Sequence, residues 1–168
     1  MATTLKGVEP ANNPALAEIE KKTGPSNFFR TMAHRQEAMQ DFAKLYGTLM
    51  GPSARLDKRI REMVFLAVSY VNETPYCAAH HQKTGLTSGL SERELAEINT
   101  ENDWHFSDKE RAALHYAREL TRKADVSDDL RYRVQELFST DEFVELTMIV
   151  ALANFTNRFS NGTGIPME

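Results

Sequence analysis

The chain has 168 residues, of which 41% are hydrophobic and 26% charged, and its net charge is −4. These values are typical of one globular domain and exclude a disordered chain or a coiled rod. No cluster of basic residues indicates a nucleic-acid partner, and no apolar run approaches the roughly 18 residues that a membrane-spanning helix needs.

Helical signals begin at Asn13, which can cap a helix that has Pro14 in its first turn. Apolar residues then follow helical spacing from Ser26 until Gly51 and Pro52 stop them, as one long helix or as two shorter ones.

Asp57 is a candidate cap for the next helix, which is apolar on nearly all sides between residues 60 and 71 and should therefore be buried. A shorter helix is predicted to start with Thr74 as its cap and Pro75 in its first turn. It is expected to end at Gly85.

Three later helices begin with the Ser-x-x-Glu pattern of a reciprocal capping box. Ser127 is a candidate cap for a further helix, and the last helix is expected to run from about Asp141 to Phe159. No alternating pattern predicts a strand, so we expect an all-α fold, a compact single-domain bundle of about seven to eight helices. The three boxes are Ser91 with Glu94, Ser107 with Glu110, and Ser139 with Glu142.

The polar, unpatterned residues 1–12 are expected to form a flexible arm, residues 13–160 the helical domain, and residues 161–168 a tail. The amino terminus lacks the apolar segment of a signal peptide, and one cysteine can form no disulfide within the chain. We therefore expect a cytoplasmic protein.

The one cysteine, Cys77, falls at the third position of the helix that starts after Thr74. Free backbone N–H groups and the positive end of the helix dipole favour an anion there, so this position favours a thiolate. His81 lies one turn later on the same face, within reach of the sulfur. A nucleophile and a base are therefore placed together by helix geometry.

Glu62 is a candidate third member of this group. If the helices on either side of Glu73 form an antiparallel pair, position 62 lies within one turn of His81. The carboxylate could then orient the histidine, as the acid does in other nucleophile and base pairs.

The same residues could instead have purely structural roles. A lone cysteine is often a buried small hydrophobic residue, and Glu62 could instead pair on the surface with Arg59 or Lys58. His80 and His81 point about 100° apart on a helix, so they cannot chelate one metal ion together. We expect no metal and no cofactor.

Three other histidines have no partner that spacing reveals, and we expect them to be structural or exposed. A tryptophan between two helices could line a pocket, but we expect it to fill a gap. The histidines are His34, His105 and His115, and the tryptophan is Trp104.

The segment from Glu62 to His81 resembles the alkylhydroperoxidase D and carboxymuconolactone decarboxylase superfamily. Its peroxidase branch carries a glutamate, eleven residues, Cys-x-x-Cys, three residues and a histidine. Here Glu62, Cys77 and His81 match that spacing, and Thr74 stands at the first cysteine. Residues 54–57 and 154–158 are also similar, so the resemblance covers about residues 55–160, with its central motif in 55–85.

The resemblance implies an alkylhydroperoxidase D-like fold in which Cys77 attacks a hydroperoxide while Glu62 and His81 move protons. Because Thr74 has no thiol, a sulfenic acid on Cys77 would need an external thiol reductant. Thr74 could instead cap the helix and hold a water near the sulfur. Besides Thr74, we expect Tyr76 and His80 to support the site.

Two further functions belong to the same resemblance. One is a cofactor-free decarboxylase-like lyase that acts on a small lactone acid, for which Arg55, Arg59, Arg61 and Arg158 are available. The other is a non-catalytic homologue whose role is to form the oligomer itself. Family members assemble as trimers or hexamers, so we also expect a homo-oligomer.

Overall fold

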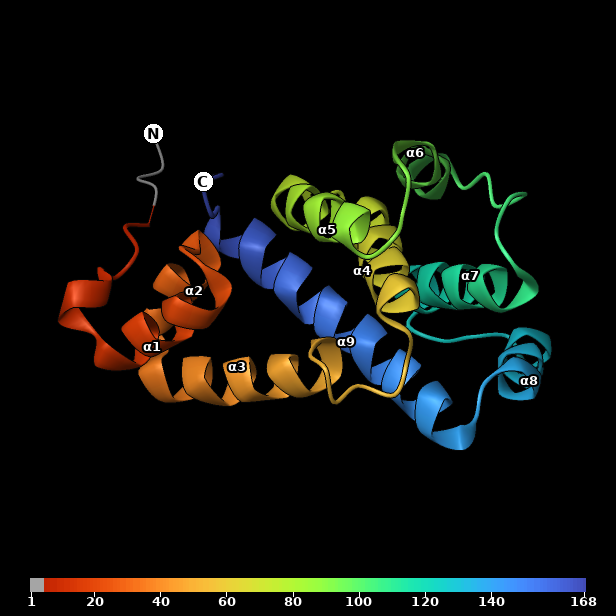
Figure 1. Cartoon of the computed structure of the whole chain (residues 1–168), viewed down its shortest axis with the longest axis horizontal. Coiled ribbons are helices and arrows are strands. Elements are labelled where there is room, and N and C mark those ends of the chain that lie inside the picture. The colour runs from red at the N-terminus through yellow and green to blue at the C-terminus, as the bar shows by residue number, and fades with distance from the viewer. Residues whose placement is uncertain (1–4) are drawn as a thin grey trace.

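The computed structural model describes residues 5–168, which form a bundle of helices with no strand (Figure 1). Two short 3-10 helices, Pro10–Asn12 and Ala33–Arg35, accompany the α-helices of this range. These are α1 (Pro14–Thr23), α2 (Asn27–Met32), α3 (Gln36–Met50), α4 (Lys58–Val71), α5 (Pro75–Thr87), α6 (Glu92–Thr100), α7 (Asp108–Lys123), α8 (Asp128–Leu137) and α9 (Thr140–Thr163).

The predicted all-α, single-domain architecture is confirmed, with nine α-helices in the described range where seven or eight were expected. The extra helix arises because the segment after Ser26 is two helices, divided by the 3-10 turn Ala33–Arg35. No helix within residues 5–168 combines the length and the apolar character that crossing a membrane requires.

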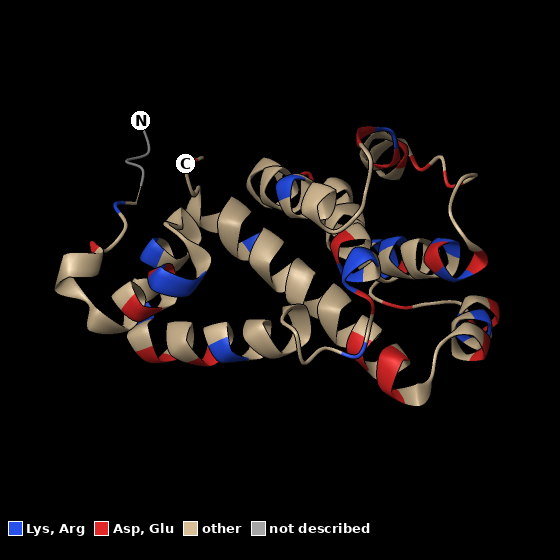
Figure 2. Ribbon diagram, viewed as in Figure 1, with Lys and Arg blue, Asp and Glu red and all other residues tan. Residues whose placement is uncertain are grey.

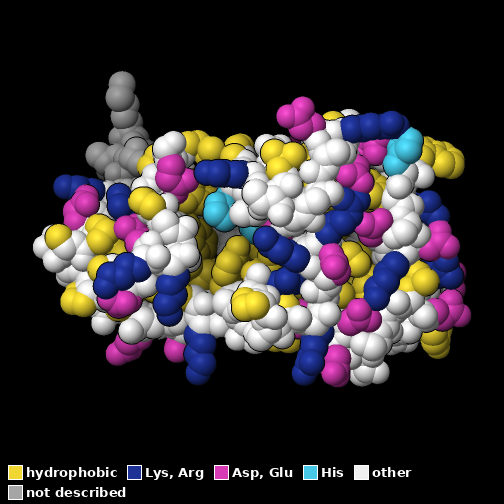
Figure 3. Space-filling model, viewed as in Figure 1, with side chains coloured by type: hydrophobic (Ala, Val, Ile, Leu, Met, Phe, Trp, Pro, Cys, Tyr) yellow, Lys and Arg dark blue, Asp and Glu magenta, His cyan; other side chains and the backbone are white. Residues whose placement is uncertain are grey.

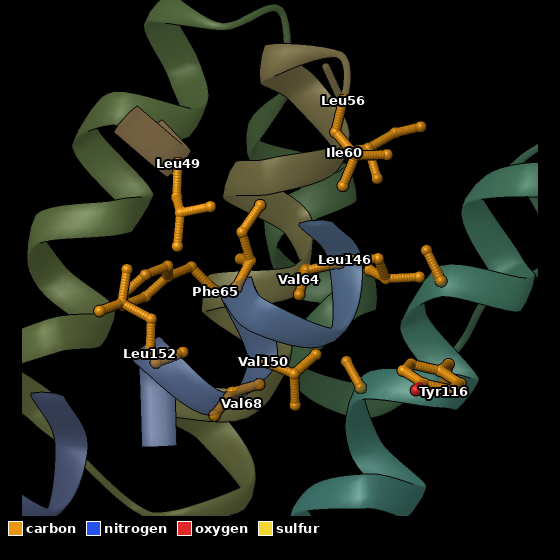
Figure 4. Packing of buried hydrophobic residues seen from close by; sticks show 14 of the residues in the cluster. Leu49, Leu56, Ile60, Val64, Phe65, Val68, Tyr116, Leu146, Val150 and Leu152 are labelled. Carbon is orange, nitrogen blue, oxygen red and sulfur yellow. The ribbon is translucent and has the colours of Figure 1, made fainter. Parts of the chain in front are cut away.

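Helix α4 lies at the centre of the molecule, where it packs against α5, α6, α7 and α9. Every residue from Ile60 to Ser69 is buried, as its unbroken apolar character predicts. Figure 4 shows Val64, Phe65 and Val68 of α4 meeting Leu146 and Val150 of α9 in the core. This packing gives α4 a fixed position from which it can hold functional side chains.

Charged residues are numerous along α6, α7 and α8, whereas most of α9 has none (Figure 2). This difference matches burial, since α9 runs through the core and contributes Ile149, Val150 and Ala153 to it. The three outer helices face solvent with their charged sides.

All three predicted capping boxes are present, with both reciprocal hydrogen bonds in each. Asn13 and Asp57 also cap their helices through their side chains. Ser127 stands at the predicted N-cap position of α8, but its side chain makes no capping hydrogen bond there.

The prediction that α5 ends at Gly85 is wrong. The helix continues to Thr87, and the residue with a left-handed backbone is Gly89, with φ +89°. Gly85 is small for another reason: a Cβ there would lie 3.0 Å from Leu90 Cδ1 and 3.3 Å from Leu95 Cδ2. It lets α5 approach the start of α6 closely.

The last helix is longer than predicted, because α9 continues through Asn161 to Thr163 and ends at Gly164. The segment that follows it, from Gly164 to Glu168, packs Ile165 against the core. Of the predicted arm 1–12, residues 1–4 lie outside the described residues. Val8 donates a backbone hydrogen bond to Arg30 and contacts the core.

Trp104 does not fill a gap, because 85% of its surface is exposed. The segment between α6 and α7 is anchored instead by Phe106 and by Asp103, which pairs with the buried Arg118. His105 and His115 are exposed, as predicted.

Candidate functional site

The site is built on the turn that joins α4 to α5. Glu73 takes a left-handed conformation with φ 49°, and the Thr74 N–H donates to the Ser69 carbonyl at 2.9 Å. The side-chain amide of Asn72 donates to Asn154 and Asn157 of α9, each at 3.0 Å. These contacts fix the reversal that places α4 and α5 side by side.

This antiparallel arrangement brings Glu62 of α4 and His81 of α5 into contact. His81 Nδ1 lies 2.7 Å from Glu62 Oε2, and both residues are about 95% buried. Thr84, one turn beyond His81, donates its hydroxyl to the same carboxylate oxygen at 2.6 Å. The interpretation that Glu62 forms a surface ion pair is wrong, because Glu62 is buried and Arg59 pairs instead with Glu94 and Glu110.

Glu62 is held in its ionised form. Burial alone would raise the pKa of this carboxyl, but the hydrogen bond and charge of His81 and the hydrogen bond from Thr84 outweigh it and lower the pKa. Because an ionised carboxylate can only accept, His81 carries its proton on Nδ1. The imidazole ring stacks on Phe65 with 3.9 Å between ring centroids.

Cys77 is the third residue of α5 and is 5% exposed. Its Sγ lies 3.6 Å from the hydroxyl Oγ of Ser160, a buried residue of α9. The sulfur therefore contacts a hydroxyl group and belongs to the first turn of α5, at the positive end of the helix dipole.

Thr74 occupies the N-cap position of α5, but the prediction that it caps the helix is wrong. Its hydroxyl donates to the Asn72 carbonyl at 3.3 Å and accepts from the Asn161 amide at 3.0 Å. These bonds are favoured because Thr74 is 2% exposed and faces α9. It does not line the cavity beside Cys77.

Tyr76 and His80 flank the site. The Tyr76 hydroxyl donates to Glu168 Oε1 at 2.5 Å and accepts from the Phe28 N–H at 3.1 Å. Burial, followed by the hydrogen bond to Glu168, raises the pKa of Tyr76 to about 12. Burial and the neighbouring charge of His81 lower the pKa of His80, so this imidazole is neutral at neutral pH.

A cavity of about 330 Å³ opens between α2 and α3 on one side and α4 and α5 on the other. Figure 3 shows a hollow with an apolar floor and histidine at its edge in this region. Its polar lining includes Cys77, His80, His81 and Glu62, with Lys58 at its rim. The remainder is largely aromatic and comes from Phe28, Phe29, Phe42, Tyr46, Phe65 and Tyr76.

Three residues of this site were not predicted from the sequence. Thr84 could have been found, since it lies one turn beyond His81 on the same helix. Ser160 of α9 and Tyr46 of α3 carry no local signal, because they reach the site only through the packing of distant helices. The residues brought together can position a small apolar molecule beside one thiol and one oriented imidazole.

The model of the carboxymuconolactone decarboxylase family matches residues 36–119, half of the chain and all of the α4–α5 motif. The uncharacterized protein YdfG of Bacillus subtilis is 28% identical over 112 residues, which are 65% of this chain and 76% of that protein.

Solved structures show the same fold. The apo debrominase Bmp8 superposes with a TM-score of 0.87 at 18% identity, covering 100% of this chain and 94% of Bmp8. The protein ATU0492 of Agrobacterium tumefaciens, described as a putative antioxidant defence protein AhpD, gives a TM-score of 0.75 at 24% identity. That match covers 82% of this chain and 94% of the other.

Proposed function

The chain belongs to the carboxymuconolactone decarboxylase family, and on that premise we propose that it reduces organic hydroperoxides with Cys77 as the attacking thiolate. One observation carries this proposal: an imidazole oriented by Glu62 at 2.7 Å lines the same aromatic cavity as the only cysteine of the chain. A nucleophile, a base and an orienting acid are the parts that such chemistry needs.

The proposed first step gives the Cys77 proton to Nε2 of His81, the ring nitrogen that Glu62 leaves free. The thiolate then attacks the terminal oxygen of the hydroperoxide, so that an S–O bond forms and the O–O bond breaks. The leaving alkoxide takes the proton from His81. The products are a sulfenic acid on Cys77 and an alcohol.

An external thiol completes the cycle, because the chain has no second cysteine. One thiol condenses with the sulfenic acid, releasing water and forming a mixed disulfide, and a second thiol displaces Cys77 from it. The two external thiols are oxidised to a disulfide. A reducing compartment such as the cytoplasm would supply them.

The cavity favours a hydroperoxide on an apolar organic group over hydrogen peroxide, since six aromatic side chains line it. The test is steady-state consumption of cumene hydroperoxide and of hydrogen peroxide with a monothiol as reductant. We expect turnover to be faster with cumene hydroperoxide and to vanish in Cys77→Ser. Turnover that survives in Cys77→Ser would contradict the thiol mechanism.

A thiol-dependent debromination is the second candidate, favoured by the same aromatic lining. Bmp8 is a debrominase, and a cysteine-to-alanine variant of it was crystallised with 2,3,4-tribromopyrrole. In this chain Cys77 would take bromine from an aromatic ring while the ring gains a proton, and thiols would then release bromide. Bromide release from tribromopyrrole in the presence of a thiol, lost in Cys77→Ser, distinguishes this function.

A lyase acting on a lactone acid is supported less well. None of Arg55, Arg59, Arg61 and Arg158 lines the cavity, and Arg59 is already paired with two glutamates. Decarboxylation of a lactone acid by both the wild type and Cys77→Ser would favour it. A thiol that reacts with neither a peroxide nor a brominated ring would favour the non-catalytic alternative.

We also propose that the chain forms a homo-oligomer, a trimer or a hexamer. Val144, Met148 and Phe155 of α9 are each 43–51% exposed, at spacings that bring them to one side of the helix. Light scattering at micromolar concentration tests this proposal, and a purely monomeric protein would contradict it.

A further inference from the structure

Tyr46 lies on α3, outside the segment that carries the other proposed catalytic residues, and lines the cavity that holds Cys77. Its ring lies 5.9 Å from that of Phe42 and meets the edge of Phe65 at 6.2 Å between centroids. Phe65 in turn stacks on His81. The position of the tyrosine ring is therefore set by aromatic packing that continues to the proposed base.

The Tyr46 hydroxyl differs from those of the other tyrosines that border the core. Tyr76 bonds Glu168 and Phe28, Tyr116 bonds Thr147 at 2.9 Å, and Tyr70 accepts from Gln82 at 2.9 Å. No group of residues 5–168 is hydrogen-bonded to the hydroxyl of Tyr46. Because Tyr46 is only partly buried and lines the cavity, its hydroxyl is free to bond a molecule there.

This hydroxyl is a donor at neutral pH. Burial, and then the negative charges of Glu62 and Cys77, raise the pKa of Tyr46 far above its ordinary value. The positive charge of Arg61 offsets only part of this rise. The phenol lines the same cavity as Glu62 and Cys77, on which the proposed reaction depends. A phenol O–H in such surroundings can stabilise negative charge that develops on a bound substrate.

We propose that the Tyr46 hydroxyl donates a hydrogen bond to the leaving oxygen of the hydroperoxide as the O–O bond breaks. This inference rests on the proposed function. The electron pair of the broken bond stays on that oxygen, and Tyr46 stabilises the charge until the oxygen takes the proton held by His81. The sulfenic acid, the alcohol and the proton balance are otherwise unchanged.

The variant Tyr46→Phe isolates this role. It keeps the ring that packs against Phe42 and Phe65, and it removes a hydroxyl that bonds nothing within the described chain. Three rates are measured at Cys77 by mass spectrometry: oxidation by cumene hydroperoxide, oxidation by perbenzoic acid, and alkylation by iodoacetamide. The leaving group is an alkoxide with cumene hydroperoxide, a carboxylate with perbenzoic acid and iodide with iodoacetamide. A hydrogen-bond donor helps the alkoxide most and iodide least.

We expect Tyr46→Phe to slow oxidation by cumene hydroperoxide about 100-fold, the cost typical of one lost donor to a developing oxyanion. Oxidation by perbenzoic acid should fall much less, and alkylation should stay at the wild-type rate. Tyr132→Phe is the matched control, because Tyr132 of α8 is 69% exposed and does not line the cavity. It should leave all three rates unchanged.

Wild-type rates with cumene hydroperoxide in Tyr46→Phe would overturn the inference while leaving the proposed function intact. An equal loss in all three rates would also overturn it, because it would mean that Tyr46 acts on the thiolate or on the shape of the cavity. A wild-type protein that neither peroxide oxidises at Cys77 would contradict the proposed function, and this inference would fall with it.

Discussion

His81 Nδ1 lies 2.7 Å from Glu62 Oε2, in a contact between α4 and α5 that is almost fully buried. A single hydrogen bond of this kind settles which ring nitrogen holds the proton and leaves the other free for chemistry. The proposed function depends on this relationship, because His81 could not otherwise accept the Cys77 proton reliably.

Replacing Glu62 by Gln should slow oxidation of Cys77 by cumene hydroperoxide by about tenfold or more, since an amide no longer fixes the tautomer of His81. The rate should also acquire a different pH profile, because the charge that acts on His81 is lost. Stopped-flow measurements across pH check both effects.

The control for this variant is Glu37→Gln, an exposed glutamate on α3 that does not line the cavity. It should keep the wild-type rate and profile. A Glu62→Gln protein with the wild-type pH profile would contradict the positioning role.

Replacing Ser160 by Ala should slow alkylation of Cys77 a few-fold at neutral pH, because the hydroxyl 3.6 Å from the sulfur can stabilise the thiolate. Iodoacetamide labelling followed by intact mass measures the rate. Ser53→Ala, an exposed position outside the site, is the control. Faster alkylation in Ser160→Ala would instead mean that the hydroxyl only shields the sulfur.

Replacing Thr74 by Cys should permit a disulfide with Cys77, since the N-cap and third residues of one helix lie within a single turn. Turnover with a dithiol reductant should then rise. Non-reducing mass spectrometry detects the bond as a loss of two hydrogen masses. If both thiols stay free after oxidation, the orientation of residue 74 toward Asn161 prevents the pairing.

The acid stability of the fold should depend on Glu94, which pairs with Arg59 beside Glu110. The hydrogen bond from Arg59 is the main cause that lowers the pKa of Glu94 to about 2 from the ordinary 4.5. A folded-state pKa below the unfolded one stabilises the fold above pH 4.5. This contribution is lost as the pH falls from 4.5 to 2.

Glu94→Gln should therefore reduce the free energy of unfolding at pH 7 by about 1–3 kcal/mol, and by progressively less below pH 4.5. Glutamine can still complete the capping box with Ser91, so the helix start is spared. Glu92→Gln, in the same turn but exposed, should leave stability unchanged. Denaturant titrations at pH 7 and pH 3 test this, and an equal loss at both would contradict the pairing.

The sequence could predict those features whose causes are local. The capping box of Ser91 and Glu94 needs only four residues, and the contact between Glu62 and His81 follows from two helices and a tight turn. Gly85 shows the limit of this reasoning, because the glycine is required by the side chains of Leu90 and Leu95 and not by a helix end.

Features that depend on distant packing could not be predicted. Ser160 reaches Cys77 across 83 positions. Tyr46 enters the cavity only because α3 packs beside α9 and the Tyr46 ring meets Phe65 of α4. Thr74 was expected to cap α5, but its hydroxyl bonds Asn161 of a helix far along the chain. Trp104 was expected to be packed, and its exposure depends on which residues anchor its loop.

The proposed function requires Cys77 to be the thiol that reacts with peroxide. Intact mass of the reduced protein, taken after one equivalent of cumene hydroperoxide with a sulfenic-acid trap present, tests this most directly. We expect rapid formation of one trapped adduct at Cys77, absent in Cys77→Ser and strongly slowed in His81→Ala. A wild-type thiol that remains unmodified while the peroxide persists would contradict it.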